Sequence, residues 1–179
     1  VRLSAAQQAA NFDKFIDELK AAPSPTVGEL FVFVDECHRT QNGRLNRTMK
    51  ALLPRLKAKG IRVVANAGGV NPLACRDALA KVAAELGVDI KIGVVLGDDL
   101  SARATELRER GITEMFSGTS FPQRCASINA YLGALPIAQA LGEGCDVVIT
   151  GRCVDSAVTL GVLVHEFGWQ AGDHDRLAQ

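Results

Sequence analysis

Polar and glycine-rich segments follow four short apolar runs of the chain. These segments are "DECH" (35–38), "NAGGVNP" (66–72), "GDD" (97–99) and "TGRCVD" (150–155). Carboxylates can bind a divalent cation or transfer protons, and a glycine corner before a helix can receive an anion on its backbone N–H groups. We therefore expect these segments to supply the residues of a binding site.

The segment 66–72 has the features of an anion-binding corner between a strand and a helix. Gly68 and Gly69 let the backbone approach a ligand or adopt a positive φ, Asn71 suits a helix N-cap, and Pro72 suits the first helical turn. Alternatively, the two glycines only form a tight turn and Asn71 only caps the helix. The chain has no G-x-G-x-x-G sequence and no G-x-x-x-x-G-K-[ST] sequence.

The two later segments offer charged side chains. Asp98 and Asp99 could hold a divalent metal, bind hydroxyl groups or transfer protons; alternatively, Asp99 caps the next helix and Asp98 lies in solvent. Gly151 would form the corner that lets Arg152 bind a phosphate or carboxylate with two parallel hydrogen bonds. Asp155 could orient Arg152, or the two could form a purely internal salt bridge.

The elements that must position these residues follow from apolar periodicity and helix-stop signals. We expect strands over 30–34, 61–65, 90–96 and 146–150. We expect helices beginning near Ser4 and over 44–59, 72–86, 100–110, 126–141 and 154–167, with a loop over 112–123. Pro54 and Pro136 should kink or divide their helices. Short apolar strands alternating with helices predict an α/β fold with three layers, in which helices cover both faces of a mainly parallel sheet.

Composition limits the class of protein. The 179 residues are 47% hydrophobic and include 20 basic and 20 acidic residues, so one domain with a real core is expected and nucleic acid is an unlikely partner. No apolar run reaches the roughly 20 residues that cross a membrane. The five cysteines are scattered without a C-x-x-C pair and are interpreted as reduced thiols rather than a zinc site.

Two histidines and two isolated aromatic residues are not interpreted as site residues. His165 lies in an apolar helical run and is interpreted as a structural histidine, whereas His174 is expected to be exposed. Tyr131 and Trp169 are isolated and form no stacking ladder for single-stranded nucleic acid.

The stretch "FVFVDECHRTQNGRLNRTMKALLP" (31–54) resembles the second helicase motif of type I restriction enzyme motor subunits, an apolar strand followed by D-E-x-H. The resemblance implies that Asp35 and Glu36 coordinate magnesium, which makes them the candidate metal ligands. The phosphate-binding loop with its lysine, which should precede this motif, is absent from the sequence.

Four longer blocks resemble a different family. "GIRVVANAGGVNPLAC" (60–75), "GVVLGDDL" (93–100), "NAYLGALPIAQAL" (129–141) and "DVVITGRCVDSAVTLGVLVHEFGW" (146–169) look like the N-terminal domain of the acyclic terpene utilisation (AtuA) family. The resemblance covers roughly residues 50–179. The positions that match the family's motifs are Asn66, Gly68, Gly69, Asn71, Asp98, Asp99, Asn129, Arg152 and Asp155. The glycine-rich first strand and corner of the family, of the kind G-x-S-G-F-x-G-D, is not present.

The AtuA resemblance implies a cytoplasmic protein that takes part in the breakdown of acyclic terpenoids and branched acids as acyl-CoA thioesters. Its expected ligand is an acyl-CoA or another anionic small molecule, with a possible divalent metal and with the reaction, if any, undefined. The alternatives are a fragment of an ATP-dependent restriction translocase and a non-catalytic scaffold completed by a partner subunit or by a second copy. We expect residues 1–54 to differ in ancestry from an AtuA-like domain over 55–179 that is truncated at its C-terminus.

Overall fold

The computed structural model describes residues 52–69 and 71–178, the strand 31–34 and six helical positions in the N-terminal region (7, 10, 11, 13, 14 and 17). The candidate metal ligands Asp35 and Glu36 lie outside the described residues, as does the first half of the helix expected over 44–59. Residues 52–58 are helical and include Pro54.

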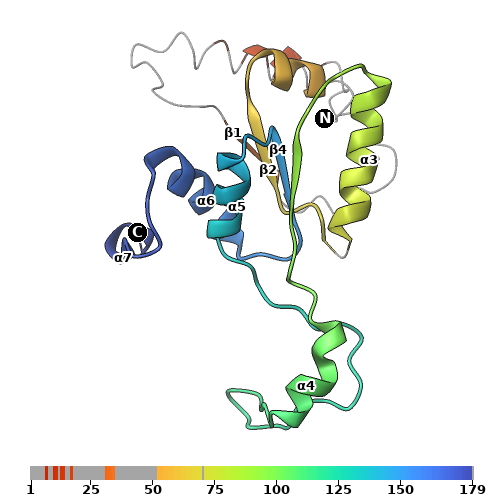
Figure 1. Cartoon of the computed structure of the whole chain (residues 1–179), viewed down its shortest axis with the longest axis vertical. Helices are drawn as coiled ribbons and strands as arrows, with labels where there is room; N and C mark the ends of the chain where they lie inside the picture. Colours follow the sequence, from red (N-terminus) through yellow and green to blue (C-terminus); the bar gives the residue numbers. More distant parts are fainter. Residues whose placement is uncertain are drawn as a thin grey trace.

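A sheet of four parallel strands forms the centre of the molecule (Figure 1). The strands are β1 (Phe31–Val34), β2 (Arg62–Ala65), β3 (Ile92–Val95) and β4 (Val147–Thr150), in the spatial order β1-β2-β4-β3. All four lie within the ranges expected from the sequence. β4 pairs with β2 on one side and with β3 on the other, with Val148 opposite both Val64 and Gly93.

Helices cover both faces of this sheet, which confirms the three-layer α/β fold. Helix α3 (Pro72–Glu85) lies on the face that buries Val63, Val147 and Ile149. Helices α5 (Leu135–Gly142) and α6 (Asp155–Phe167) lie on the opposite face. Alternate residues of one strand thus enter different layers, as the two-residue period of a strand requires.

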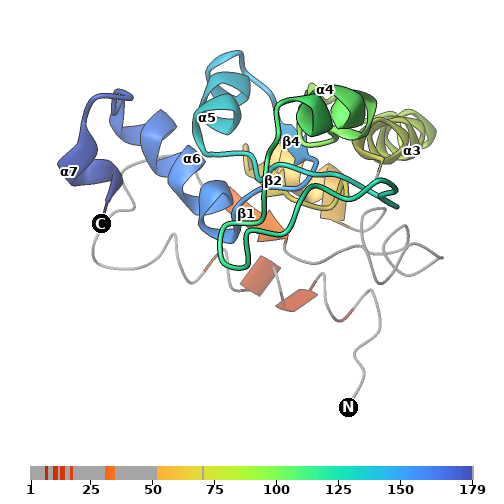
Figure 2. The same ribbon diagram turned by 90° about the horizontal axis from the view of Figure 1, so that it is seen from below.

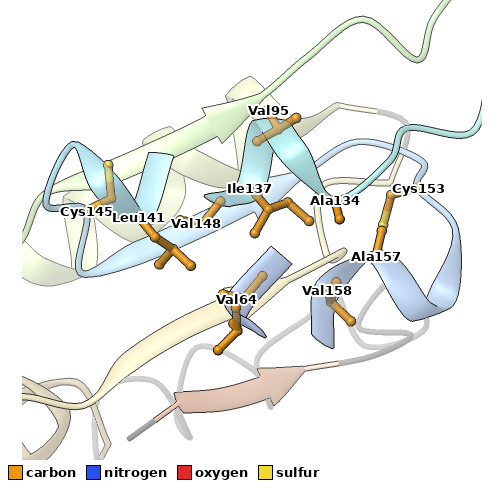
Figure 3. Packing of buried hydrophobic residues seen from close by; sticks show 11 residues of the cluster. Val64, Val95, Ala134, Ile137, Leu141, Cys145, Val148, Cys153, Ala157 and Val158 are labelled. Carbon is orange, nitrogen blue, oxygen red and sulfur yellow. The ribbon is translucent and has the colours of Figure 1, made fainter. Parts of the chain in front are cut away.

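The layer beneath α5 and α6 contains the larger buried cluster. Val64 and Val148 of the sheet and Ile137 and Leu141 of α5 are almost completely buried there (Figure 3). The two helices approach closely at Gly161, where an added methyl group would lie 2.7 Å from the Ile137 side chain. Glycine therefore sets the distance between α5 and α6.

Two predictions from the sequence fail in the remaining elements. The helix expected over 126–141 was wrong in its first half, because only Leu135–Gly142 is helical. The tail after Gly168, for which no helix was expected, contains the short helix α7 (His174–Leu177). The expected exposure of His174 is confirmed, and His165 is half-buried with its Nε2 atom 3.1 Å from the Arg62 guanidinium.

Residues 99–131 leave the sheet and form a projection that we call the arm (Figures 1 and 2). It contains a 3-10 turn (Ser101–Arg103) and helix α4 (Ala104–Glu109), and it returns to the body just before α5. Leu107, at 9% exposure, is its one buried residue. The helices that the structure describes are all too short or too polar to cross a membrane.

Candidate functional site

The chain changes direction at the carboxyl ends of β2 and β4. These strands are neighbours, yet α3 leaves β2 toward one face of the sheet and α6 leaves β4 toward the other. In open parallel sheets, ligands bind beyond the strand ends at such a switch point. The segments singled out in the sequence after β2, β3 and β4 all lie along this edge.

Asp98 joins three segments at this edge. Its Oδ2 atom accepts hydrogen bonds from the Arg152 backbone N–H at 2.9 Å and from the Asn129 side-chain amide at 3.3 Å. The side chain is only 4% exposed, so the interpretation that Asp98 lies in solvent was wrong. A methyl group at Gly151 would lie 2.0 Å from Asp98 Oδ1, so Gly151 is required for this contact.

The returning end of the arm extends the same edge, and this explains why residues 126–134 are not helical. The backbone N–H of Leu132 donates to the Arg152 carbonyl at 3.1 Å, and the N–H of Val154 donates to the Leu132 carbonyl at 3.0 Å. Ala130 N–H donates to the Asp98 carbonyl at 2.8 Å. These tertiary hydrogen bonds replace the helical ones, and α5 begins at Leu135, one residue before Pro136, which suits a first turn.

Arg152 presents its guanidinium group to solvent at this edge. The guanidinium carbon lies 5.7 Å from the centre of the Tyr131 ring, a cation–π distance. Arg152 and Asp155 form no ion pair in the described part of the chain, so the internal salt bridge is not observed. Asp155 is exposed in the first turn of α6. The cation thus remains available to an anionic ligand.

Tyr131 is the site residue that sequence reasoning missed. As an isolated aromatic residue it did not indicate a binding role. It lies two positions after Asn129 in the block "NAYLGALPIAQAL". In an extended segment, residues two apart project to the same side. The extended conformation of 129–132 was therefore the information needed to place Tyr131 beside Arg152.

Asp99 has a local role. Its Oδ1 atom accepts the Ser101 N–H at 2.9 Å, and hydrogen bonds from Ser101 hold the pKa of Asp99 below its ordinary value. Asp99 also pairs with Asn129 in an isolated antiparallel bridge. Asp99 therefore forms a local turn with Ser101 and not the expected helix cap, because Leu100 is the N-cap of the 3-10 turn and no side chain caps it. The carboxylates of Asp98 and Asp99 accept hydrogen bonds from different residues.

The corner after β2 is held against the end of β4. Gly68 N–H donates to the Thr150 carbonyl at 3.1 Å, and a methyl group at Gly68 would lie 2.3 Å from that oxygen. Gly69 has a φ of 49°, and Asn71 Oδ1 accepts the Ala74 N–H at 3.0 Å. Asn71 is thus a helix cap, whereas Gly68 allows two backbones to approach.

The comparison with protein-family models decides the family. The model described as "acyclic terpene utilisation family protein AtuA" matches residues 36–179. The chain belongs to the AtuA family. The comparisons with curated proteins and with solved structures returned no match.

The AtuA match covers the carboxyl ends of β2, β3 and β4 but not β1. Its range includes Glu36 and part of the helicase-like segment, while the proposed boundary at residue 54 stays a prediction. Within this AtuA chain, the structure brings Asp98, Asn129, Gly151 and Arg152 into contact, with Gly68 bonded to the neighbouring Thr150. Asn66 lies half-buried just after β2.

The cysteines that the structure describes form no disulfide, and one of them, Cys153, lies at this edge. Cys75, Cys125, Cys145 and Cys153 are free thiols, of which Cys145 and Cys153 are buried. Cys153 Sγ lies 3.4 Å from the Thr150 hydroxyl, which donates to the Gly151 carbonyl at 2.8 Å. No cluster of three or more His, Cys, Asp or Glu side chains occurs among residues 52–69 and 71–178 or the few described positions before them.

Proposed function

We propose that this AtuA protein binds an anionic small molecule, an acyl-CoA thioester of an acyclic terpenoid or branched acid, across the carboxyl ends of β2 and β4. The family supports the metabolic context, and the strand-order switch between β2 and β4 supports the position, because ligands of open parallel sheets bind beyond the strand ends at such a switch. The exposed Arg152 guanidinium is the single observation that carries the proposal. The proposal places the protein in the cytoplasm.

Arg152 suits a phosphate or carboxylate because its side chain is held without being neutralised. Tyr131 orients the guanidinium through its ring face and leaves the N–H groups directed away from the ring free to bind. The Arg152 backbone is in turn fixed by the buried Asp98. Because the arginine side chain is already restricted before binding, less conformational entropy is lost when the ligand binds.

Backbone groups at two helix ends add to the attraction for an anion. Helix α3 begins after the Gly68–Asn71 corner, and α6 begins at Asp155 without a side-chain cap. The unpaired N–H groups and the dipole at a helix N-terminus favour negative charge. The two helices follow neighbouring strands, so both begin at the carboxyl edge of the sheet.

The three candidate acids divide into different roles in this proposal. Asp98 is a positioning residue, because its buried carboxylate accepts hydrogen bonds from the Arg152 backbone N–H and the Asn129 side-chain amide. Asp99 fixes the start of the arm through Ser101. Asp155 lies three residues after Arg152 and is exposed. In this proposal its carboxylate contacts a ligand hydroxyl or transfers a proton.

Isothermal titration with CoA, a panel of branched acyl-CoAs and the matching free acids tests the proposal. We expect saturable acyl-CoA binding that weakens at least tenfold in Arg152→Gln and is partly retained in Arg152→Lys. Arg124→Gln removes the same charge from an exposed arm residue and should leave binding unchanged. Absence of binding to every compound, or equal loss in both glutamine variants, would contradict the proposal.

A further inference from the structure

Arginine lies over an aromatic ring at two places in the described chain, and the two guanidinium groups are used differently. Arg108 lies 6.0 Å from the centre of the Phe121 ring, and it also donates hydrogen bonds to two backbone carbonyls of the segment 122–123. Arg152 lies 5.7 Å from the centre of the Tyr131 ring, and within the described part of the chain its guanidinium forms no hydrogen bond or ion pair. The first pair therefore holds the arm together, whereas the second leaves its cation to solvent.

The Tyr131 ring is held in place by backbone hydrogen bonds rather than by burial. Tyr131 is 63% exposed. On one side of it, Ala130 N–H donates to the Asp98 carbonyl at 2.8 Å, and on the other side, Leu132 N–H donates to the Arg152 carbonyl at 3.1 Å. Most of the ring surface is thus accessible on a backbone whose position is fixed.

Asp98 connects the backbones that carry the ring and the cation. Its carbonyl accepts the N–H next to Tyr131, and its Oδ2 atom accepts the Arg152 N–H at 2.9 Å. The two side chains are therefore placed beside each other before a ligand binds. Less conformational entropy is lost on binding when the contact groups are already in position.

The two side chains recognise different chemical groups. A guanidinium binds phosphate through parallel hydrogen bonds, and an aromatic ring stacks on a nucleobase. A nucleotide carries these two groups one ribose apart, and the 5.7 Å between cation and ring lets one nucleotide contact both. The phosphates of an acyl-CoA all lie at its nucleotide end, so charge directs that end to Arg152.

We propose that Tyr131 is a specificity-determining residue that stacks on the adenine base of the ligand while Arg152 binds its phosphate. This inference rests on the proposed function, because it identifies which end of the acyl-CoA occupies the edge beside β4. The acyl chain then extends away from Tyr131 and Arg152. Affinity accordingly depends mainly on the nucleotide and little on the length or branching of the acyl chain.

NMR tests the base contact directly, because Tyr131 is the one tyrosine of the chain and its ring protons are easily assigned. We expect nuclear Overhauser effects between these ring protons and the adenine H2 and H8 protons of bound CoA. A tyrosine that only orients Arg152 would not produce this signature. Contacts from the ring to acyl or pantetheine protons alone, or none to a ligand that binds, would overturn the proposal.

Isothermal titration measures what the ring contributes to affinity. Tyr131→Leu should weaken the binding of CoA and of branched acyl-CoAs alike, by about fivefold or more, whereas Tyr131→Phe should retain it. Phe116→Leu removes an aromatic ring that is 89% exposed at the tip of the arm, and this matched control should leave binding unchanged. Unchanged affinity in Tyr131→Leu would contradict stacking.

Competition separates this inference from the proposed function on which it rests. Adenosine 3′,5′-bisphosphate, which lacks the pantetheine and acyl groups, should displace a bound acyl-CoA at millimolar concentration. An acyl-CoA that binds but is not displaced would overturn the inference and leave the proposed function standing. Absence of binding by CoA and by every acyl-CoA would overturn both.

Discussion

The body and the arm of this molecule are stabilised in different ways. In the body, both faces of the sheet are covered, and side chains such as Val64, Val148 and Ile137 are fully buried. In the arm, most residues are exposed and the shape depends on local polar contacts such as Glu114 with Ser117. The candidate site lies where the two regions join, because Asp98 precedes the arm and its carboxylate accepts hydrogen bonds from the Arg152 backbone and from Asn129 near the returning end of the arm.

Truncation of a core side chain should have the largest effect. Ile137→Ala removes a fully buried side chain that packs on Gly161, and we expect it to lower the free energy of unfolding by about 2–5 kcal/mol. Denaturant unfolding followed by circular dichroism measures this loss. Leu73→Ala, at an exposed position of α3, should change it by less than about 0.5 kcal/mol. Leu107→Ala should cost clearly less than Ile137→Ala; equal costs would show that Leu107 is packed as tightly as the core of the body.

A methyl group at the corner after β2 should have the next largest effect. In Gly68→Ala, the new carbon would meet the Thr150 carbonyl oxygen at 2.3 Å, and a backbone atom cannot move aside as a side chain can. We expect a loss of about 1–3 kcal/mol in the free energy of unfolding. Gly133→Ala is the matched control, since its methyl group would have no neighbour within 4 Å; a similar loss there would refute the steric explanation.

The sequence predicted the body better than the arm, for a physical reason. Buried parallel strands are continuous apolar runs, so β2 and β4 could be located from residue types alone. Residues 126–134 were expected to be helical because apolar spacing was the available signal, whereas their conformation is set by hydrogen bonds to 98 and 152, far away in sequence. Periodicity cannot report such contacts.

The candidate site was predicted in its positions but not in its contacts. The strand-end rule selected Asp98 and Arg152 because the carboxyl ends of parallel strands share one edge. The burial of Asp98 and the stacking of Tyr131 on Arg152 depend on how the arm returns, and no local pattern encodes that path.

Weakening the junction should loosen the arm more than the body. Asp98→Asn keeps the size of the side chain but places an amide next to the Arg152 and Asn129 donors, and we expect a cost of about 1–3 kcal/mol. Hydrogen exchange should accelerate at residues 128–132 and much less in β2 and β4. Asp89→Asn, at an exposed position, serves as the control. Uniform acceleration across the sheet would contradict a local role for Asp98.

The smallest expected effect is a pH response of the arm tip. Hydrogen bonds from Ser117 and then from Phe116 hold the pKa of Glu114 below its ordinary value. A depressed folded-state pKa means that the tip gains its stabilisation above the unfolded-state pKa and loses it as the pH falls through the folded-state value. Amide chemical shifts of Phe116 and Ser117 should titrate in that acidic range, and Glu114→Gln should abolish the titration. Persistence of the titration in this variant would assign it to another group.

The central claim is that the joined ends of β2, β4 and the arm form an anion-binding site. Amide chemical shifts recorded by NMR during titration with a branched acyl-CoA test it most directly. We predict saturable shifts concentrated at Gly68, Gly69, Arg152 and Asp155, reduced in Arg152→Gln. Saturable shifts confined to the opposite edge of the sheet, or no shifts at these residues up to millimolar ligand, would contradict the account.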